Sequence, residues 1–383
     1  AAGPITRFDA TNFKTKFACE VKDFNAEEYL DRKEVRKTDL FAQYAIAAAE
    51  QAFQDSGLDL EKIDLDEAGV IWGAGIGGII TFMDEVKAYV QGNGVPRFNP
   101  FFIPKMISDI ASGHISMKYG FRGPNYGTVS ACASSTHAIG DAFNLIRLGK
   151  AKVFITGGSE AAINEAGVGG FNALQALSTR NDDPATASRP FDKDRDGFVI
   201  GEGGGALILE EYEYAVSRGA HIYCEIVGCG MTADAYHLTA PHPEGLGARK
   251  VMGATLKDGN IEPSDVDYIN VHGTSTPLGD VAEIKAIKEV FGEHAYKLNI
   301  SSTKSMTGHL LGGTGAIEAI ACILAIKNGI VPPTINNFNL DPELDTKLNF
   351  TLNKAQERKV RVAISNTFGF GGHNACVAFK SLE

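Results

Sequence analysis

The sequence predicts an α/β fold built from two halves. Three observations support this prediction. Short runs rich in β-branched residues alternate with longer amphipathic stretches along the whole chain. No repeat with a period of about 20 to 50 residues occurs, which excludes solenoids and propellers. The length of 383 residues suits two domains of ordinary size, and we expect their boundary in a seam near residues 212–225.

The predicted elements alternate between the two types in chain order. The predicted strands are 70–75, 152–160, 205–211, 268–276 and 360–372. The clearest predicted helices are 39–57, the segment that follows Cys132 and runs to residue 151, 281–292 and 315–329. The last helix ends at a glycine, which commonly caps a helix. This alternation favours packed layers of helices and sheets.

Composition and charge exclude several classes of protein. Hydrophobic residues make up 44% of the chain and charged residues 22%, as in ordinary folded proteins. The net charge of -11 disfavours nucleic acid or an anionic membrane as the main partner. The six cysteines are scattered without a C-x-x-C pair, which indicates a reducing, cytoplasmic compartment without disulfides or structural zinc.

The start of the chain resembles neither a signal peptide nor a membrane anchor. AAGPITRFDA lacks the charged start and the apolar core of a signal peptide, and no apolar stretch approaches the roughly 20 residues of a membrane span. The chain opens directly in a Gly-Pro turn. We therefore expect it to begin partway into its first domain.

Cys132 is the first candidate for a catalytic residue. The run SACASS places its thiol between a short β-branched segment and an Ala-rich helix, with small residues on both sides. The free N–H groups of a helix end lower the pKa of a thiol and stabilise an oxyanion, as an acyl acceptor requires. The alternative is that Cys132 is only a small buried hydrophobic residue.

Two histidines in polar loops favour catalysis. His272 follows a predicted strand and heads the run HGTSTPLGD, and catalytic side chains of α/β folds converge at strand ends. His309 shares a polar loop with Lys304 in the run TKSMTGHLLGGTGA. Close helix packing explains the glycines of this loop but not its polar residues. Together the histidines support a nucleophilic role for Cys132.

Two glycine-rich runs differ in what they indicate. In TFGFGGHNA, Phe368 and Phe370 alternate with glycines, so a backbone N–H can approach a reacting carbonyl while an aromatic ring closes over it. The alternative is that Phe370 fills the core at a turn. GAGIGG (73–78) matches a dinucleotide-binding motif, but the acidic residue expected about 20 residues later is missing, so we reject NAD binding.

These segments together resemble the elongating β-ketoacyl-acyl carrier protein synthases, over essentially the whole chain. The resemblance rests on the runs around Cys132, His272 and His309, on DKDRDGFVIGEGGG (192–205) and on the terminal GFGG. It implies the thiolase fold, an α/β fold whose two related halves pack as five layers, αβαβα. The first half (1–218) would carry the cysteine and the second (219–383) both histidines. Family members normally start earlier with an additional strand, which leaves the edge of the first sheet open.

The resemblance also implies a reaction. Cys132 takes an acyl chain from acyl carrier protein (ACP) as a thioester, malonyl-ACP loses carbon dioxide, and the enolate attacks the thioester to give a 3-oxoacyl-ACP in fatty acid elongation. His272 and His309 donate N–H groups to the malonyl thioester oxygen. The N–H groups of Cys132 and Phe370 hold the acyl thioester oxygen, and Phe370 is also a gate. No bound cofactor is expected, because substrates arrive on the phosphopantetheine arm of ACP, and the family implies a homodimer.

Further positions match the family. Lys304 and Glu318 are expected to support the histidines, and Asp280 and Glu283 to pair with Lys304. The substrate-binding positions are Thr274 and Thr276 for the phosphopantetheine arm, Phe368, and Ile76 at the acyl pocket, where type II enzymes carry isoleucine. No metal is required. Asn270, Glu318, Ser365 and Asn366 match positions that surround a monovalent cation in some relatives.

A basic helix is the predicted docking site for ACP, which is strongly acidic. In RKEVRK (32–37), Lys33 and Lys37 share one helical face and Arg36 lies nearby. The alternative is an ordinary solvated helix start.

Several related activities use similar residues. A thiolase or a chain-initiating synthase would use Cys-His-Cys or Cys-His-Asn, and His309 argues against both. A non-catalytic chain-length factor lacks the nucleophile, and Cys132 argues against it. A ketosynthase of a type II polyketide or specialised fatty acid pathway uses the same Cys-His-His set and stays open, as does a cysteine hydrolase that releases free acid.

Overall fold

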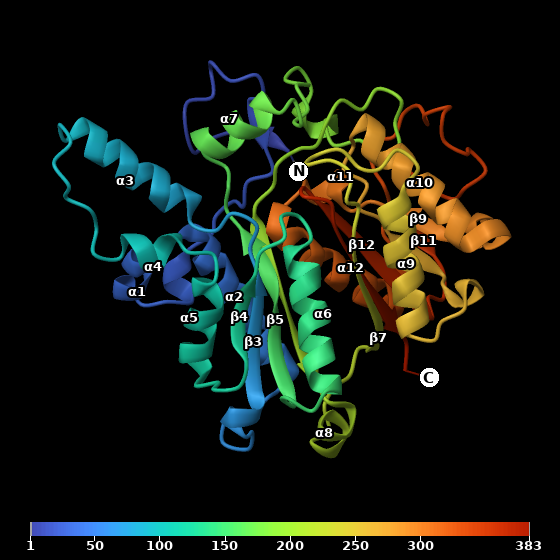
Figure 1. The fold of residues 1–383 in the computed structure, drawn as a ribbon, viewed down its shortest axis with the longest axis horizontal. Helices are drawn as coiled ribbons and strands as arrows, with labels where there is room; N and C mark the ends of the chain where they lie inside the picture. The colour runs from blue at the N-terminus through green and yellow to red at the C-terminus, as the bar shows by residue number, and fades with distance from the viewer. Residues whose placement is uncertain (1, 383) are drawn as a thin grey trace.

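The computed structural model describes residues 2–382, whose two large sheets have helices between them and on both outer faces (Figure 1). The first sheet has the strand order β4-β3-β5-β6 and the second β7-β13-β12-β8-β9. The strands of the first sheet are β3 (Ala68–Gly73), β4 (Asn125–Thr128), β5 (Val153–Glu160) and β6 (Gly203–Glu210). Those of the second are β7 (Glu225–Ala233), β8 (Tyr268–Asn270), β9 (Asn299–Ser301), β12 (Val362–Gly369) and β13 (His373–Lys380).

The helices complete five layers. α6 (Ser134–Arg147) and α12 (Thr314–Asn328) lie in the middle and contact both sheets. α2 (Leu40–Ser56) and α5 (Ile110–Tyr119) cover the outer face of the first sheet. α9 (Leu246–Asp258) and α10 (Pro277–Phe291) pack in the hydrophobic core on the outer face of the second. The five-layered α/β arrangement expected from the sequence is thus present.

The central position of α12 explains why its sequence is so apolar. One segment, Leu311–Asn328, is long and apolar enough by length and composition to cross a membrane. It is 61% buried inside the protein, because α12 is packed between the two sheets. Helices enclosed on both sides are hydrophobic all round.

The remaining elements are shorter or lie outside the layers. α3 (Ile79–Gln91) projects from the body of the molecule (Figure 1). The other α-helices are α1 (Arg32–Lys37), α4 (Phe102–Met106), α7 (Glu165–Ala173), α8 (Tyr212–Ser217) and α11 (Lys304–Thr307). The two-residue strands are β1 (Gly3–Pro4), β2 (Phe17–Ala18), β10 (Ile330–Val331) and β11 (Gln356–Glu357).

The sequence located most of the layered elements but not all their ends. Each predicted helix is present, with ends shifted by a few residues. The predicted strand 268–276 ends at Asn270, because the chain then leaves the sheet to form the loop that carries His272. The predicted strand 360–372 ends at Gly369, where a turn leads into β13. Four strands of the two sheets were not predicted: β4, β7, β9 and β13. β4 and β9 have only four and three residues, and glycines interrupt β7. β13 directly follows the turn that the predicted strand 360–372 includes.

Candidate active site

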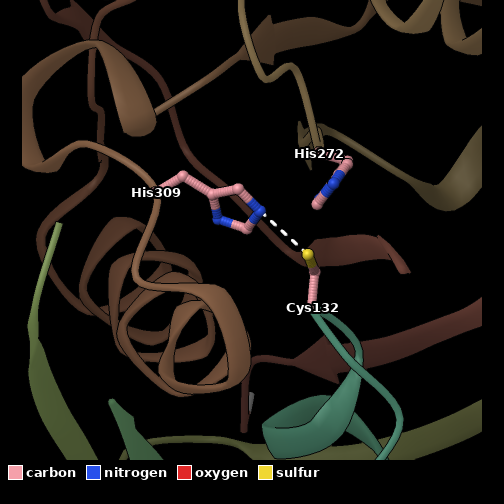
Figure 2. Close-up of side chains that lie close together, drawn as sticks. All are labelled: Cys132, His272 and His309. Atoms are coloured by element: carbon pink, nitrogen blue, oxygen red, sulfur yellow. Dashed lines mark hydrogen bonds between the residues drawn. The ribbon is translucent and has the colours of Figure 1, made fainter. Parts of the chain in front are cut away.

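The side chains of Cys132, His272 and His309 meet in one cavity of about 420 Å³ (Figure 2). The Sγ atom of Cys132 lies 3.0 Å from Nε2 of His309. The two imidazole rings are 5.3 Å apart between centroids. The Sγ atom of Cys132 and one ring nitrogen of each histidine all lie within 4.8 Å of one another. Three residues that are distant in the sequence therefore face one reaction centre.

Each of the three residues lies where a regular element begins or ends. Cys132 precedes α6, His272 follows β8, and His309 lies between α11 and α12. The turn before Cys132 is held by Ser134, whose hydroxyl donates to the Ala131 carbonyl at 2.7 Å and accepts from the Ser130 N–H at 2.9 Å. These hydrogen bonds compensate for the left-handed backbone of Ala131, which has a φ of 51°.

The Cys132 thiol corrects one expectation from the sequence. Burial raises the pKa of this thiol to about 12, against the lowering effect of the Lys304 ammonium, and the Glu160 carboxylate raises it further. The expected lowering by a helix end is therefore outweighed by loss of solvation. Cys132 is a thiol at neutral pH, so its proton needs an acceptor, and the His309 nitrogen is at hydrogen-bonding distance.

Both histidines are neutral. Burial lowers the pKa of each imidazole well below its usual range, and the Lys304 ammonium lowers both further. Nδ1 of His309 hydrogen-bonds to Oγ1 of Thr314 at 2.8 Å. A hydroxyl can donate or accept, so Thr314 is compatible with either tautomer of His309. Nothing in the sequence had identified Thr314, which lies five residues after His309 at the start of α12.

Lys304 is paired differently from what we expected. Its Nζ donates to Oε1 of Glu318 at 2.5 Å, and the two side chains are 2% and 1% exposed. Asp280 instead lies 3.4 Å from the Arg195 guanidinium and accepts from the Phe191 N–H. The predicted pairing of Asp280 with Lys304 is therefore wrong: its cationic partner comes from the 192–205 segment.

Glu283 also has a different contact from the expected one. Its carboxylate accepts the backbone N–H groups of His272 and Gly273, each at 2.9 Å. It accepts a third hydrogen bond from Asn366. Burial raises the pKa of Glu283 to about 7. Lys304 acts on Glu283 only through its charge, which lowers this pKa. Glu283 thus fixes the backbone of the His272 loop.

Two backbone N–H groups are directed at the sulfur of Cys132. Those of Cys132 and Phe370 both act on the thiol and lower its pKa. Phe370 begins the turn between β12 and β13, in which Gly371 and Gly372 have left-handed φ values of 87° and 75°. Its ring lies at the cavity wall, 6.4 Å from the ring of Phe171. Two N–H groups at one sulfur, with a ring at the cavity wall, are what the predicted oxyanion hole and gate require.

The predicted substrate-binding residues fall into two groups. Thr274, Thr276 and Phe368 line the cavity, and the two threonine hydroxyls are 3.0 Å apart. Ile76 does not line it: this residue lies on the turn between β3 and α3 and is 37% exposed. The predicted docking residues do not line the cavity either. Lys33 and Arg36 are exposed on α1, and Lys37 is paired with Glu34.

A segment without predicted structure forms much of the cavity mouth. Residues from 234 to 245 contribute, among others, Asp234, His237 and Leu238. The segment is tied to the Phe370 turn, because the Leu238 carbonyl accepts the Gly371 N–H at 2.7 Å. Its sequence, DAYHLTAPHPEG, has no helical or strand period. Its content of histidine and proline was the only feature that could have indicated a functional loop.

The four predicted cation ligands share one property. Asn270 and Ser365 are neighbours on the paired strands β8 and β12, and α12 packs against both strands. Among the described residues, the buried side-chain oxygens without a hydrogen-bond partner include Asn270 Oδ1, Glu318 Oε2, Ser365 Oγ and Asn366 Oδ1. Buried acceptors are normally satisfied, so the oxygens of Asn270, Glu318 and Ser365 fit a cation that prefers oxygen ligands. Asn366 follows Ser365 on β12, so its side chain lies on the opposite face of the sheet, where it donates to Glu283.

A buried cysteine beside two neutral histidines, with two N–H groups at its sulfur, defines an acyl-transfer site. Two family models match the chain: "Beta-ketoacyl synthase, N-terminal domain" over residues 3–215 and "Beta-ketoacyl synthase, C-terminal domain" over residues 223–338. The chain belongs to the β-ketoacyl synthase family.

Curated relatives and solved structures agree with this family. The chain is 53% identical to the 3-oxoacyl-[acyl-carrier-protein] synthase 2 of Synechocystis sp., covering 100% of this chain and 91% of the relative. It is 51% identical to the protein of the same name from Staphylococcus aureus, covering 99% and 91%.

Two similar solved structures are the ishigamide ketosynthase/chain length factor and a β-ketoacyl synthase from Burkholderia phymatum. The first has a TM-score of 0.92 at 33% identity, covering 100% of this chain and 92% of the other. The second has a TM-score of 0.90 at 34% identity, covering 98% and 91%. The fold is the thiolase fold of the ketosynthases.

Proposed function

We propose that this protein is a type II 3-oxoacyl-ACP synthase that elongates fatty acids by decarboxylative condensation. The observation that carries the proposal is the contact of Cys132 Sγ with His309 Nε2 in a cavity that His272 also lines. The names of the relatives at 51% and 53% identity support the same activity.

The first half-reaction transfers an acyl group to Cys132. Neutral His309 takes the thiol proton at Nε2, and the sulfur attacks the acyl-ACP carbonyl, whose developing charge is met by the N–H groups of Cys132 and Phe370. The thiolate of ACP then leaves and receives the proton that His309 had taken. One thioester is exchanged for another, so no oxidant or further co-reactant is required.

The second half-reaction needs donors rather than a base. When malonyl-ACP loses carbon dioxide, negative charge moves onto its thioester oxygen, and neutral His272 can present an N–H to that oxygen. His309 can do the same in its Nε2–H tautomer, which the Thr314 hydroxyl permits. The resulting enolate carbon attacks the acyl thioester, and the released Cys132 thiolate takes a proton from water. Burial keeps both imidazoles neutral, so their N–H groups donate without a charge change.

Intact-mass measurement tests the proposal. Mixing the protein with acyl-ACP should add one acyl group, and subsequent malonyl-ACP should release a 3-oxoacyl-ACP two carbons longer. Cys132→Ala should form no adduct. Cys19→Ala is the matched control, since Cys19 and Cys132 are both 8% exposed. An adduct that persists in Cys132→Ala would refute the assignment of the nucleophile.

Product analysis separates this activity from its alternatives. A cysteine hydrolase would release free fatty acid without malonyl-ACP. A type II polyketide ketosynthase would extend its product repeatedly without reduction of the keto group. The solved ketosynthase/chain length factor is 33% identical to this chain, lower than the relatives named as 3-oxoacyl-ACP synthases, which favours fatty acid elongation.

ACP docking on α1 is part of the proposal, with Lys33 and Arg36 as exposed cationic groups. One solved neighbour is a ketosynthase complex with an acyl carrier protein, which supports a carrier protein as partner. Charge reversal at Lys33 and Arg36 should raise the KM for ACP substrates without changing acylation by small thioesters. Lys354→Glu, at another exposed position, is the control. An unchanged KM would exclude this docking site.

We also propose a homodimer, supported by the apolar face of α3. Phe82, Val86 and Val90 follow one another at four-residue spacing and are 47%, 40% and 68% exposed. A projecting helix with such a face suits burial against a second copy. Val90→Asp should give a monomer in sedimentation analysis, and a wild-type monomer would refute the proposal.

The monovalent cation is proposed on the basis of the unsatisfied oxygens of Asn270, Glu318 and Ser365. A bound ion would lie beside Glu318 Oε2 and hold β8 against β12. The melting temperature should rise when potassium or sodium replaces tetramethylammonium at constant ionic strength. This rise should be lost in Ser365→Ala, and an equal rise in that variant would place the ion elsewhere.

The remaining proposals concern organisation and location. We place the boundary of the two halves between residues 218 and 219, in the stretch that separates β6 and β7. A cytoplasmic location is supported by the cysteines, all of which are free.

A further inference from the structure

Glu160 is a buried carboxylate that the proposed mechanism does not use. It ends β5 and is fully buried. Its hydrogen bonds come from the backbone N–H groups of Gly75, Ile76, Gly77 and Gly312, at 2.7 to 3.1 Å. Within residues 2–382, no Lys, Arg or His forms an ion pair with it. Buried charges are normally paired with an opposite charge, whereas this carboxylate is stabilised only by N–H donors.

The glycine-rich loop 73–78 owes its motif to this carboxylate. Three successive N–H groups before α3 converge on one anion, as in loops that bind phosphate. Here the anion is a side chain of the protein itself. A Cβ atom on Gly75 would lie 2.8 Å from Oε2 of Glu160, so the close approach requires glycine.

The same carboxylate oxygen also binds the loop that carries His309. Oε2 accepts the N–H of Gly312 at 3.0 Å, three residues after His309. Of the two residues between His309 and Gly312, Leu311 has a left-handed φ of 49°, which is costly for a non-glycine residue. Two residues after Gly312, the Thr314 hydroxyl hydrogen-bonds to Nδ1 of His309.

The glycine-rich loop also touches the nucleophile turn. A Cβ atom on Gly75 would lie 3.3 Å from the carbonyl oxygen of Ala131, the second strained residue of the site. Glu160 therefore lies where the turns of Cys132 and His309 meet.

We propose that Glu160 is a positioning residue that fixes the His309 loop to the glycine-rich loop 73–78 and so keeps the imidazole of His309 in register with the sulfur of Cys132. The connection runs from Glu160 through the Gly312 N–H to Thr314, and from the Thr314 hydroxyl to His309. This inference rests on the proposed function, because it assigns the aligned imidazole to decarboxylation.

Glu160→Gln tests the connection at constant shape. The amide nitrogen would face N–H donors, so one loop must move away. Displacing His309 by about 1 Å should slow malonyl-ACP decarboxylation by about 10- to 100-fold. Acylation of Cys132 should change by less than about 3-fold, because the negative charge that opposes thiolate formation is removed at the same time. Alkylation of Cys132 by iodoacetamide at pH 8 should become faster.

A double-mutant cycle with Thr314→Val identifies the route. Thr314→Val should slow decarboxylation to a similar extent, and the double variant should decarboxylate malonyl-ACP no more slowly than the slower single variant. Asp267→Asn is the control: Asp267 is 6% exposed and also accepts a backbone N–H, from Arg361, but it lies outside the cavity. Its melting temperature should fall while the ratio of the two rates stays within about 2-fold of wild type.

The outcomes are decisive. Equal losses in both half-reactions, no loss in either, or additive effects in the cycle would overturn the proposal. If Glu160→Gln does not fold, Glu160→Asp takes its place, since the shorter carboxylate cannot reach both loops. Failure of both variants to fold would leave Glu160 a purely structural residue and overturn the proposal. A wild-type protein that does not decarboxylate malonyl-ACP would instead refute the proposed function, and the alkylation measurement needs no substrate.

Discussion

Lys304→Met should destabilise the protein in a way that depends strongly on pH. The substitution keeps most of the side-chain volume but leaves Glu318 without the ammonium that lies 2.5 Å from its Oε1. Both side chains are almost fully buried, and removing one partner of such a pair costs about 3–5 kcal/mol. This is a large part of the roughly 5–15 kcal/mol by which proteins are stable.

The pH dependence follows from the pKa of Glu318. Burial raises this pKa from 4.5 to about 7 even though the Lys304 ammonium lowers it, and loss of the ammonium raises it further. Between its unfolded pKa of 4.5 and its raised native pKa, this carboxyl binds a proton in the native state that the unfolded chain lacks. Stability therefore falls as pH rises through this range. Wild-type Glu318 itself ionises above pH 7, so the extra deficit at pH 8.5 is limited to about 1.36 kcal/mol per pH unit above 7. The deficit of Lys304→Met should therefore be about 1 kcal/mol at pH 5.5 and about 3 kcal/mol at pH 8.5.

Urea unfolding at the two pH values measures the effect. The single tryptophan, Trp72, is fully buried and reports on the first half, and circular dichroism reports on the whole chain. Tetramethylammonium as the only buffer cation prevents an ion from replacing the lost charge. Adding Glu318→Gln to Lys304→Met should reduce the deficit at pH 8.5 to about 1–2 kcal/mol, because no unpaired charge remains.

Lys288→Met is the matched control for this experiment. Its partner Asp345 lies 2.6 Å away, but the side chains are 40% and 20% exposed. Exposed ion pairs contribute little to stability, so the control should lose little. Hydrogen bonds lower the pKa of Asp345 to about 2, far below both pH values, so the loss should be the same at pH 5.5 and at pH 8.5. An equal deficit of Lys304→Met at the two pH values, or a double variant as unstable as the single one, would refute the reasoning.

Three further predictions follow from the same groups. Alkylation of Cys132 should accelerate about tenfold per pH unit from pH 7 to 9, because burial raises the pKa of the thiol to about 12; a plateau within this range would contradict it. Malonyl-ACP decarboxylation should stay constant from pH 8 to below 6.5, since burial lowers the pKa values of His272 and His309 well below 6.5; a half-maximal rate near pH 6.5 would refute this. Burial raises the pKa of Glu283 from 4.5 to about 7, so the native state holds an extra proton in this window and stability falls as pH rises. Glu283→Gln should therefore flatten the dependence of the unfolding free energy on pH between 5 and 7.5, by on the order of 3 kcal/mol, and an unchanged slope in urea unfolding would exclude this origin.

The sequence could predict the centre of the site because its residues occupy element ends. Cys132, His272 and His309 lie in polar or small-residue runs at the ends of strong strand and helix patterns. Such ends gather at one edge of an α/β layer, so their meeting follows from the alternation itself. The structure places all three around one cavity.

Properties that depend on burial and on distant partners could not be predicted. The sequence shows the helix end beside Cys132, but it does not show the burial that raises the pKa of the Cys132 thiol. Arg195, the partner of Asp280, is 85 residues away, and several acidic residues offered equally plausible pairs. Thr314 matters only because the chain turns back at Leu311 and returns its hydroxyl to His309. These contacts are tertiary and leave no local pattern.

The buried ion pair is best explained by the two half-reactions together. A thiol must lose its proton to accept an acyl group, and the imidazoles must remain neutral to donate to an enolate. The Lys304 ammonium favours both conditions, because it lowers the pKa of the thiol and also the pKa values of His272 and His309. A protein in which hydrophobic residues replace both Lys304 and Glu318 would often be as stable as the original or more stable. The presence of the Lys304–Glu318 pair at the centre of the molecule is therefore better explained by catalysis than by folding.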